Sequence, residues 1–78
     1  MICSYMFPVD TLDGEMVEVY VVITRFVPSE PGTKIGTYDW YLSLEEYGAP
    51  AKIDITAESE KGINLLMPQF VQMYCEDE

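Results

Sequence analysis

The side chains that most often carry out chemistry are scarce in this sequence. It contains no histidine, which removes the commonest general base and metal ligand. Cys3 and Cys75 stand near opposite ends, and without histidine they cannot complete a zinc site. Gly32 and Gly36 are not followed by the Gly-Lys-Ser/Thr of a phosphate-binding loop. A carboxylate pair in a cleft remains formally open, but so short a chain offers little room for a cleft. We therefore expect no catalytic residue, no metal and no cofactor.

One cluster of acids deserves comparison with a metal loop. Asp10, Asp13 and Glu15 surround Gly14, as acids do in calcium-binding loops. Leu12, however, stands where such a loop needs an oxygen ligand. The favoured interpretation is an ordinary Asx-type turn between two strands, because Asp-Gly is also a strong turn signal.

The charge balance indicates what kind of partner the protein binds. Fourteen Asp and Glu residues face four Lys and Arg residues, for a formal net charge of −10. Such a protein repels nucleic-acid phosphates and anionic membranes. A basic protein surface is its electrostatic complement, and proteins that hold nucleic acid are rich in such surfaces. The alternative is that the charge only keeps a small hydrophobic protein in solution.

No targeting segment is recognised in the sequence. Residues 1–7 lack the basic start of a signal peptide, and the longest apolar run, residues 19–23, is far shorter than a membrane span. We therefore expect a cytoplasmic protein. In a reducing cytoplasm Cys3 and Cys75 are expected to be two free thiols, with a disulfide between the chain ends as the alternative.

The elements that must position these side chains are predicted to be mainly strands. At 49% hydrophobic residues, residues 1–78 are expected to fold as a single domain. Strands are predicted over residues 1–7, ending at Pro8, and over 16–27 and 35–44, which form a long central hairpin. In the second strand an aliphatic set alternates with a mixed set. The aliphatic set, expected to face the core, is Val17, Val19, Val21 and Ile23; the mixed set is Glu18, Tyr20, Val22, Thr24 and Phe26.

The C-terminal half is predicted to add a fourth strand and a short helix. Residues 51–57 alternate, with Ala51, Ile53, Ile55 and Ala57 inward and Lys52, Asp54 and Thr56 outward. A helical stripe then comprises Ile63, Leu66, Phe70, Met73 and Tyr74. Because proline breaks a helix interior, we start the helix near Pro68, and we expect the acids at 76–78 to fray its end. The predicted class is α+β: a small antiparallel sheet of three to four strands with a short C-terminal helix.

The outer faces of these strands carry the candidate partner-binding residues. Same-face residues of a strand repeat every ~6.6 Å, a spacing comparable to that of phosphates along a nucleic-acid strand. Tyrosines beside acids are typical of protein interfaces, whereas Trp40 is better explained as core. The acids that we expect to contact a partner are Glu18, Asp39, Glu45, Glu46 and Asp54, with Tyr20 and Tyr41 as anchors. The alternative is a merely solvated face.

Several segments resemble small acidic accessory proteins of tailed phages and prophages. They are the Val/Glu-alternating segment 15–20, the Pro-x-x-Pro-Gly turn at 28–32, the Pro-Ala-x-Ile-x-Ile segment 50–55 and the Gly-Ile-x-Leu-Leu segment 62–66. A subset of such phage proteins inhibits CRISPR effectors or restriction enzymes by blocking a DNA-binding surface with acids. The resemblance therefore implies an anti-CRISPR or anti-restriction role in the host cytoplasm, and it transfers no site residues.

A second hypothesis is a structural or assembly module, such as a homodimeric phage accessory protein or a minor virion component. Its motivation is the mixed face of the second strand, where apolar Val22 and Phe26 need to be covered.

Overall fold

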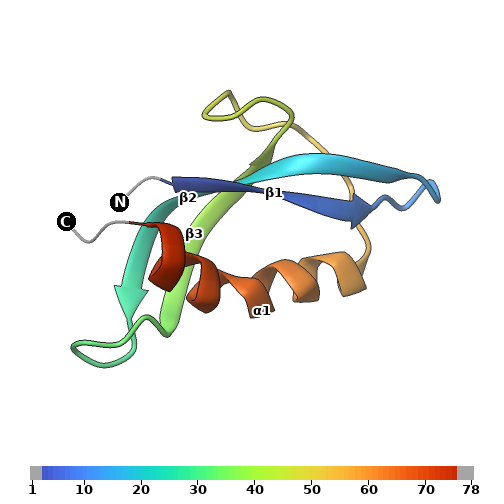
Figure 1. The fold of residues 1–78 in the computed structure, drawn as a ribbon. Helices are drawn as coiled ribbons and strands as arrows, with labels where there is room; N and C mark the ends of the chain where they lie inside the picture. Colours follow the sequence, from blue (N-terminus) through green and yellow to red (C-terminus); the bar gives the residue numbers. More distant parts are fainter. Residues whose placement is uncertain (1–2, 76–78) are drawn as a thin grey trace.

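The protein is a three-stranded antiparallel sheet with one helix packed against one face (Figure 1). The computed structural model describes residues 3–75, so the expectations for Met1, Ile2 and the acids at 76–78 lie outside the described residues. The elements are β1 (Cys3–Asp10), β2 (Met16–Pro28), β3 (Gly36–Ser43) and α1 (Ala57–Tyr74), with the strands in the order β1-β2-β3. The predicted α+β class and central hairpin are confirmed.

The core lies between the sheet and α1. Val19, Val21 and Ile23 of β2 are fully buried, as the alternation predicted, and Val17 packs against them. We call this side of the sheet the helix face and the opposite side the loop face. Ile63 and Met67 of α1 are also fully buried against the helix face, so apolar surface from four elements is removed from water.

A β-bulge changes the faces at the far end of the hairpin. Ile23 pairs with Trp40 but Arg25 pairs with Asp39, so Thr24 is an extra residue in β2. The shift turns Phe26 to the helix face, where its ring stacks on Tyr38 at a centroid distance of 4.8 Å. The prediction that Phe26 shares a face with Val22 is therefore wrong, because the extra residue reverses the alternation.

The helix is longer than predicted and begins eleven residues earlier, at Ala57 rather than near Pro68. The Thr56 side chain caps it by accepting a hydrogen bond from the Ser59 backbone N–H at 3.2 Å, so Thr56 is a cap and not an outward strand residue. Pro68 lies inside the helix. A proline costs about 3 kcal/mol there, and the burial of Ile63, Met67 and Val71 on the same side offsets that cost.

The buried stripe of α1 also differs from the predicted one. The buried residues are Ser59, Ile63, Met67 and Val71, spaced four apart, so of the predicted stripe only Ile63 is buried and Phe70 half-buried. Leu66, Met73 and Tyr74 are 36%, 59% and 67% exposed. The helix therefore presents apolar side chains to solvent as well as to the core.

Residues 44–56 form an irregular connection and not a fourth strand. It first folds over the loop face, where Glu46 accepts a hydrogen bond from Ser4, and then passes to the start of α1 (Figure 1). Its only ladder contact within the described chain is a bridge between Ile55 and Thr11. Ile53 and Ile55 nevertheless pack against the core, as predicted. Ala57, predicted to point inward, is exposed at the start of α1.

The turn between β1 and β2 is closed by a threonine. The Thr11 hydroxyl donates to the Glu15 carbonyl and accepts from the Glu15 N–H, each at 3.2 Å. Gly14 has a φ of 88°, a conformation that favours glycine, in agreement with the predicted turn. The turn is where the sequence predicted it, but it is not an Asx-type turn, because the side chain that closes it belongs to Thr11 and not to an aspartate.

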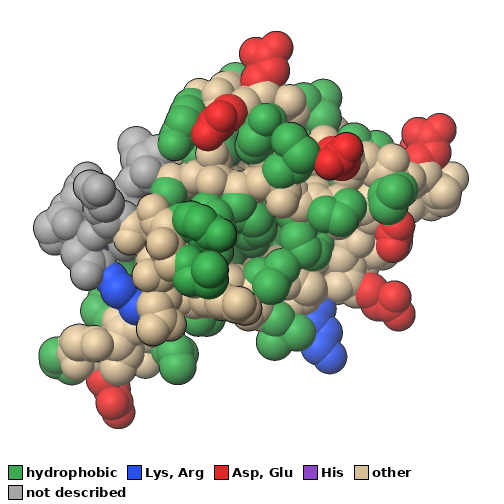
Figure 2. Space-filling view, in the orientation of Figure 1, with side chains coloured by type: hydrophobic (Ala, Val, Ile, Leu, Met, Phe, Trp, Pro, Cys, Tyr) green, Lys and Arg blue, Asp and Glu red, His purple; other side chains and the backbone are tan. Residues whose placement is uncertain are grey.

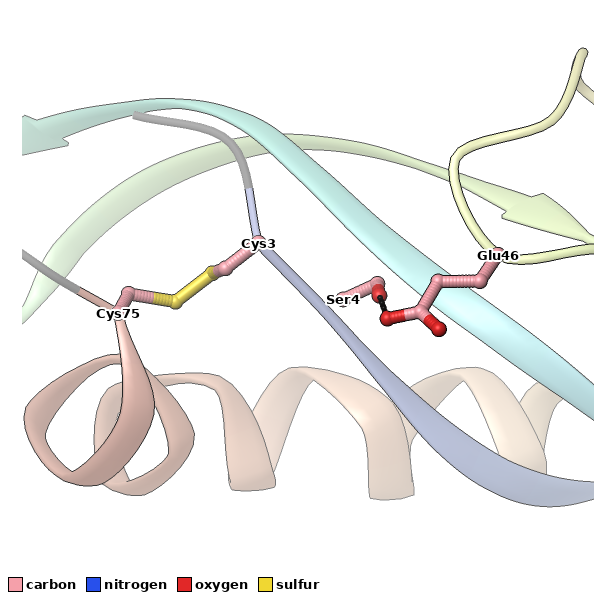
Figure 3. The surroundings of a disulfide bond; sticks show 4 residues. All are labelled: Cys3, Ser4, Glu46 and Cys75. Carbon is pink, nitrogen blue, oxygen red and sulfur yellow. Dashed lines mark hydrogen bonds between the residues drawn. A yellow bond between two sulfur atoms is a disulfide. The ribbon is translucent and has the colours of Figure 1, made fainter.

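A disulfide joins the two ends of the fold. Cys3 at the start of β1 is bonded to Cys75 at the end of α1, with their Cα atoms 5.7 Å apart (Figure 3). The expectation of two free thiols is therefore wrong, because packing of α1 along β1 brings positions 72 residues apart into bonding range. Within residues 3–75, no helix is long and apolar enough to cross a membrane.

Candidate partner-binding surface

The loop face brings together both predicted anchor tyrosines. Tyr20 of β2 pairs with Ser43, and Tyr41 of β3 pairs with Val22, so the two rings are diagonal neighbours. Both are half-buried. The Tyr41 hydroxyl donates to the Gly48 carbonyl at 2.9 Å, so its polar tip is already engaged in holding residues 44–50 over the sheet. Tyr20 is the better placed of the two to contact a partner.

Glu45 and Glu46 are positioned by the same connection. The Ser43 hydroxyl donates to the Glu45 carbonyl and accepts from its N–H, which fixes the turn after β3. The Ser4 hydroxyl donates to Glu46 Oε1 at 3.1 Å, so a carboxylate from the connection reaches across the sheet to β1 (Figure 3). Both glutamates are exposed. The prediction that acids share this face with Tyr20 thus has a geometric basis.

Asp39 lies apart from the other predicted acids. It is on the loop face opposite Arg25, a cross-strand position that lets the cation offset its charge. Glu18 and Arg25 are seven residues apart along β2, which corresponds to roughly 20 Å at the rise of a strand. Asp39 and Glu18 therefore belong to opposite ends of the sheet.

Asp54 lies at the end of the sheet where β1 stops and α1 starts. Its carbonyl accepts from the Leu12 N–H at 3.2 Å. At this end the Asp10 N–H donates to Ser59 Oγ, and the Thr56 N–H donates to the Asp10 carbonyl, each at 2.8 Å. These bonds bring together three segments distant in sequence. The exposed acids that they gather, called here the acidic end, are Asp10, Asp13, Glu15, Asp54, Glu58 and Glu60.

The space-filling view agrees with this grouping. Figure 2 shows acidic side chains around the end where β1 stops and α1 begins. Glu18 connects the acidic end with the loop face, because it pairs with Pro8, two residues before Asp10. Glu58 and Glu60 stand in the first turn of α1, where the helix dipole favours negative charge. Of the seven predicted site residues, Asp54 therefore lies at the acidic end, Asp39 lies opposite Arg25 at the far end of the loop face, and the other five lie on the rest of the loop face.

Sequence reasoning missed part of the acidic end. The sequence predicts only a turn at Asp10, Asp13 and Glu15, and Glu58 and Glu60 are not among the predicted site residues. The available signal was Thr56 followed by two glutamates, a pattern typical of a helix N-terminus. Recognising it would have placed α1, and with it these acids, beside the end of β1.

The exposed acids and tyrosines of this surface can act on other molecules by charge and by hydrogen bonding. No group of three or more acids or cysteines able to hold a metal ion is present among residues 3–75. Burial raises the pKa of Tyr5, whose hydroxyl donates to the Ile63 carbonyl at 3.4 Å, and it also raises the pKa of Tyr38. Both tyrosines are therefore neutral hydrogen-bonding groups near neutral pH.

Comparisons with family models, curated proteins and solved structures return no match to this chain.

Proposed function

We propose that this protein is a small acidic inhibitor that acts by contact, its carboxylates occupying a basic surface on a host nucleic-acid-handling defence complex. The observation that carries the proposal is the exposure of its acids. Of fourteen acidic residues, the eleven within the described chain are all exposed, and six of them make up the acidic end. A carboxylate array held at the surface acts on other molecules through contact and long-range attraction.

The local structure favours a binding role because the acids sit on rigid supports. Glu18 projects from the central strand, Asp54 is held by a backbone hydrogen bond to Leu12, and Glu58 lies in a capped helical turn. Ordering these side chains on binding therefore costs less than ordering a flexible acidic tail. Acids repeated along such supports compete with nucleic-acid phosphates for the same Lys and Arg side chains.

The proposal extends to the biological setting implied by the phage resemblance: an anti-CRISPR or anti-restriction factor in the cytoplasm of a host cell. The Cys3–Cys75 bond speaks against that compartment, since disulfides persist in oxidising environments and are rare in a reducing cytoplasm. Alkylating thiols at the moment of cell lysis tests the point. Recovery of a fully bonded pair contradicts the cytoplasmic placement, whereas alkylated Cys3 and Cys75 support that placement and mean that the disulfide-bonded form is not the one present in the cell.

The central experiment measures inhibition of DNA binding. Purified CRISPR effectors and restriction enzymes are assayed for target binding at low and high salt, with and without the protein. We expect at least one to be inhibited, and inhibition to weaken as salt rises. A triple variant, Asp13→Asn with Glu15→Gln and Asp54→Asn, removes three charges from the acidic end and is expected to weaken inhibition without unfolding the protein.

A second variant separates the loop face from the acidic end. Glu18→Gln with Glu45→Gln and Glu46→Gln removes three charges there, and the glutamine oxygen at 46 retains an acceptor for Ser4. Glu30→Gln, in the exposed connection between β2 and β3, is the control that loses charge elsewhere. Failure to inhibit any enzyme, or inhibition that is indifferent to salt and to both triple variants, contradicts the proposal.

The alternative of a homodimeric assembly module rested on two apolar side chains that needed cover. Val22 is 1% exposed within the chain, and Phe26 stacks on Tyr38. With its motivating residues covered internally, this alternative has less support than the inhibitor.

A further inference from the structure

The inhibitor proposal leaves one surface feature unused, a hollow between β1 and the last turns of α1. Its volume is about 220 Å³. Figure 2 shows hydrophobic side chains gathering over this part of the molecule. The residues that line the hollow are Tyr5, Leu66, Gln69, Phe70, Met73 and Tyr74. None of them is acidic, so the hollow is distinct from the carboxylate surface.

The wall of the hollow is held in place by contacts inside the protein. The Phe70 ring lies between Tyr5 and Tyr74, at centroid distances of 4.2 and 5.2 Å. The disulfide ties Cys75, the residue after Tyr74, to the start of β1. A wall fixed in this way loses little conformational freedom when something enters, which favours binding.

The size of the hollow limits its occupant. Pockets for drug-sized molecules have volumes of ~300–1,000 Å³, so this hollow is small for a free ligand of that kind. It suits one large side chain, and its lining of aromatic rings, Leu66 and Met73 matches an aromatic one. Met73 and Tyr74 are 59% and 67% exposed, so an inserted ring would cover apolar surface that now meets water.

Charge decides between the possible sources of that ring. A second copy of this chain also carries a net charge of −10, and two such molecules repel each other. Anionic lipid surfaces are repelled for the same reason. No Lys or Arg lines the hollow. The occupant that complements the protein's net charge of −10 is an aromatic side chain presented by a basic segment of another protein.

We propose that the hollow takes one Phe or Trp side chain, flanked by Lys or Arg, from the inhibited partner. The proposal rests on the inhibitory function above and deepens it. The carboxylates attract the basic segment, and the hollow supplies the apolar anchor that slows its release. Buried aromatic anchors surrounded by polar contacts commonly dominate protein interfaces.

The test uses three synthetic peptides as probes: Lys-Lys-Trp-Lys-Lys, Lys-Lys-Ala-Lys-Lys and Glu-Glu-Trp-Glu-Glu. Binding to the intact, disulfide-bonded protein is followed by NMR, with the Met73 methyl and the Phe70 and Tyr74 rings as reporters. We expect the basic Trp peptide to shift these signals and to bind about tenfold more tightly than the Ala peptide, as burial of one large apolar side chain implies. The acidic Trp peptide is expected to leave the signals unchanged.

Two variants locate the effect. Met73→Ala is expected to weaken binding of the basic Trp peptide about fivefold, since part of the wall is lost. Leu65→Ala removes a side chain that is 71% exposed on the same helix but outside the lining, and it is expected to leave binding unchanged. The thermal midpoint of each variant verifies that the fold is retained.

Each contrary result has a distinct meaning. Equal, salt-dependent binding of the two basic peptides refutes the aromatic anchor but leaves the electrostatic inhibitor standing. Equal binding of the acidic Trp peptide refutes the basic flank. Shifts of the same signals on raising the protein concentration alone assign the hollow to a second copy, which overturns the proposal. If neither basic peptide binds, the anchor is refuted, and the DNA-binding assay judges the inhibitory function by itself.

Discussion

Reduction of the Cys3–Cys75 disulfide is expected to remove most of the stability of this protein. The bond closes a loop across a sequence separation of 72 residues. In the chain-entropy description, opening a loop of that length raises the entropy of the unfolded chain enough to lower the free energy of unfolding by about 4.4 kcal/mol at 25 °C. Cores of domains this small supply only ~3–5 kcal/mol. The reduced protein should therefore be close to its unfolding midpoint in buffer.

The assay is urea unfolding with and without a phosphine reductant. Trp40, the single tryptophan, packs against the core and reports tertiary structure by fluorescence, while circular dichroism reports α1. With a urea slope of about 1 kcal/mol/M, the lower end of the range for small proteins, the midpoint is expected to fall by roughly 4 M. A double variant, Cys3→Ser with Cys75→Ser, should match the reduced protein and ignore the reductant.

The reasoning has a clear point of failure. A reduced protein whose free energy of unfolding falls by less than about 1 kcal/mol would show that the unfolded chain gains little from losing the link. A double variant that is far less stable than the reduced wild type would instead assign the loss to packing of the sulfur atoms, since Cys3 is 8% exposed.

Three further predictions concern stability. Met67→Ala, at a fully buried position of α1, is expected to cost about 2–5 kcal/mol, whereas Leu65→Ala on its exposed side should stay within ~0.5 kcal/mol in the same urea assay; equal effects would contradict the observed helix orientation. Thr56→Ala is expected to cost about 1 kcal/mol by removing the N-cap, with Thr56→Ser as the control that retains the hydroxyl; no loss would mean that α1 starts elsewhere. Because burial raises the folded-state pKa of Tyr5, its contribution to stability is fully present below the unfolded tyrosine pKa of ~10 and is lost as pH rises toward the folded value. Alkaline unfolding should therefore be less steep in Tyr5→Phe, as followed by circular dichroism, and an unchanged pH profile would contradict the burial of that hydroxyl.

Local pattern was sufficient for the central hairpin. The aliphatic set of β2 alternates with a mixed set of polar and apolar residues, and a strand with that period buries its uniformly aliphatic side wherever it pairs. Val19, Val21 and Ile23 are therefore buried as predicted. The bulge at Thr24 was not predictable in the same way, because an extra residue is defined only against the partner strand. The face of Phe26 depended on that pairing with β3.

The helix shows how a local rule is overridden. Pro68 alone argues for a helix start, and the sequence interpretation followed it. The Thr56 cap and the four-residue spacing of Ile63, Met67 and Val71 favour a longer helix, but that spacing gains free energy only when a sheet is present to bury it. Tertiary packing therefore decided both the length of α1 and which of its apolar residues remain exposed around the hollow.

By itself, the sequence determined the surplus of carboxylates, the absence of histidine, the α+β class and the buried side of β2, because composition and alternation are local properties. Only the tertiary structure decided which acids meet at one end, that Cys3 bonds Cys75, and that Phe70 and Tyr74 line a hollow beside Tyr5. These features join residues far apart along the chain. Their proximity follows from how α1 packs along β1, a choice made by the summed burial of the whole core.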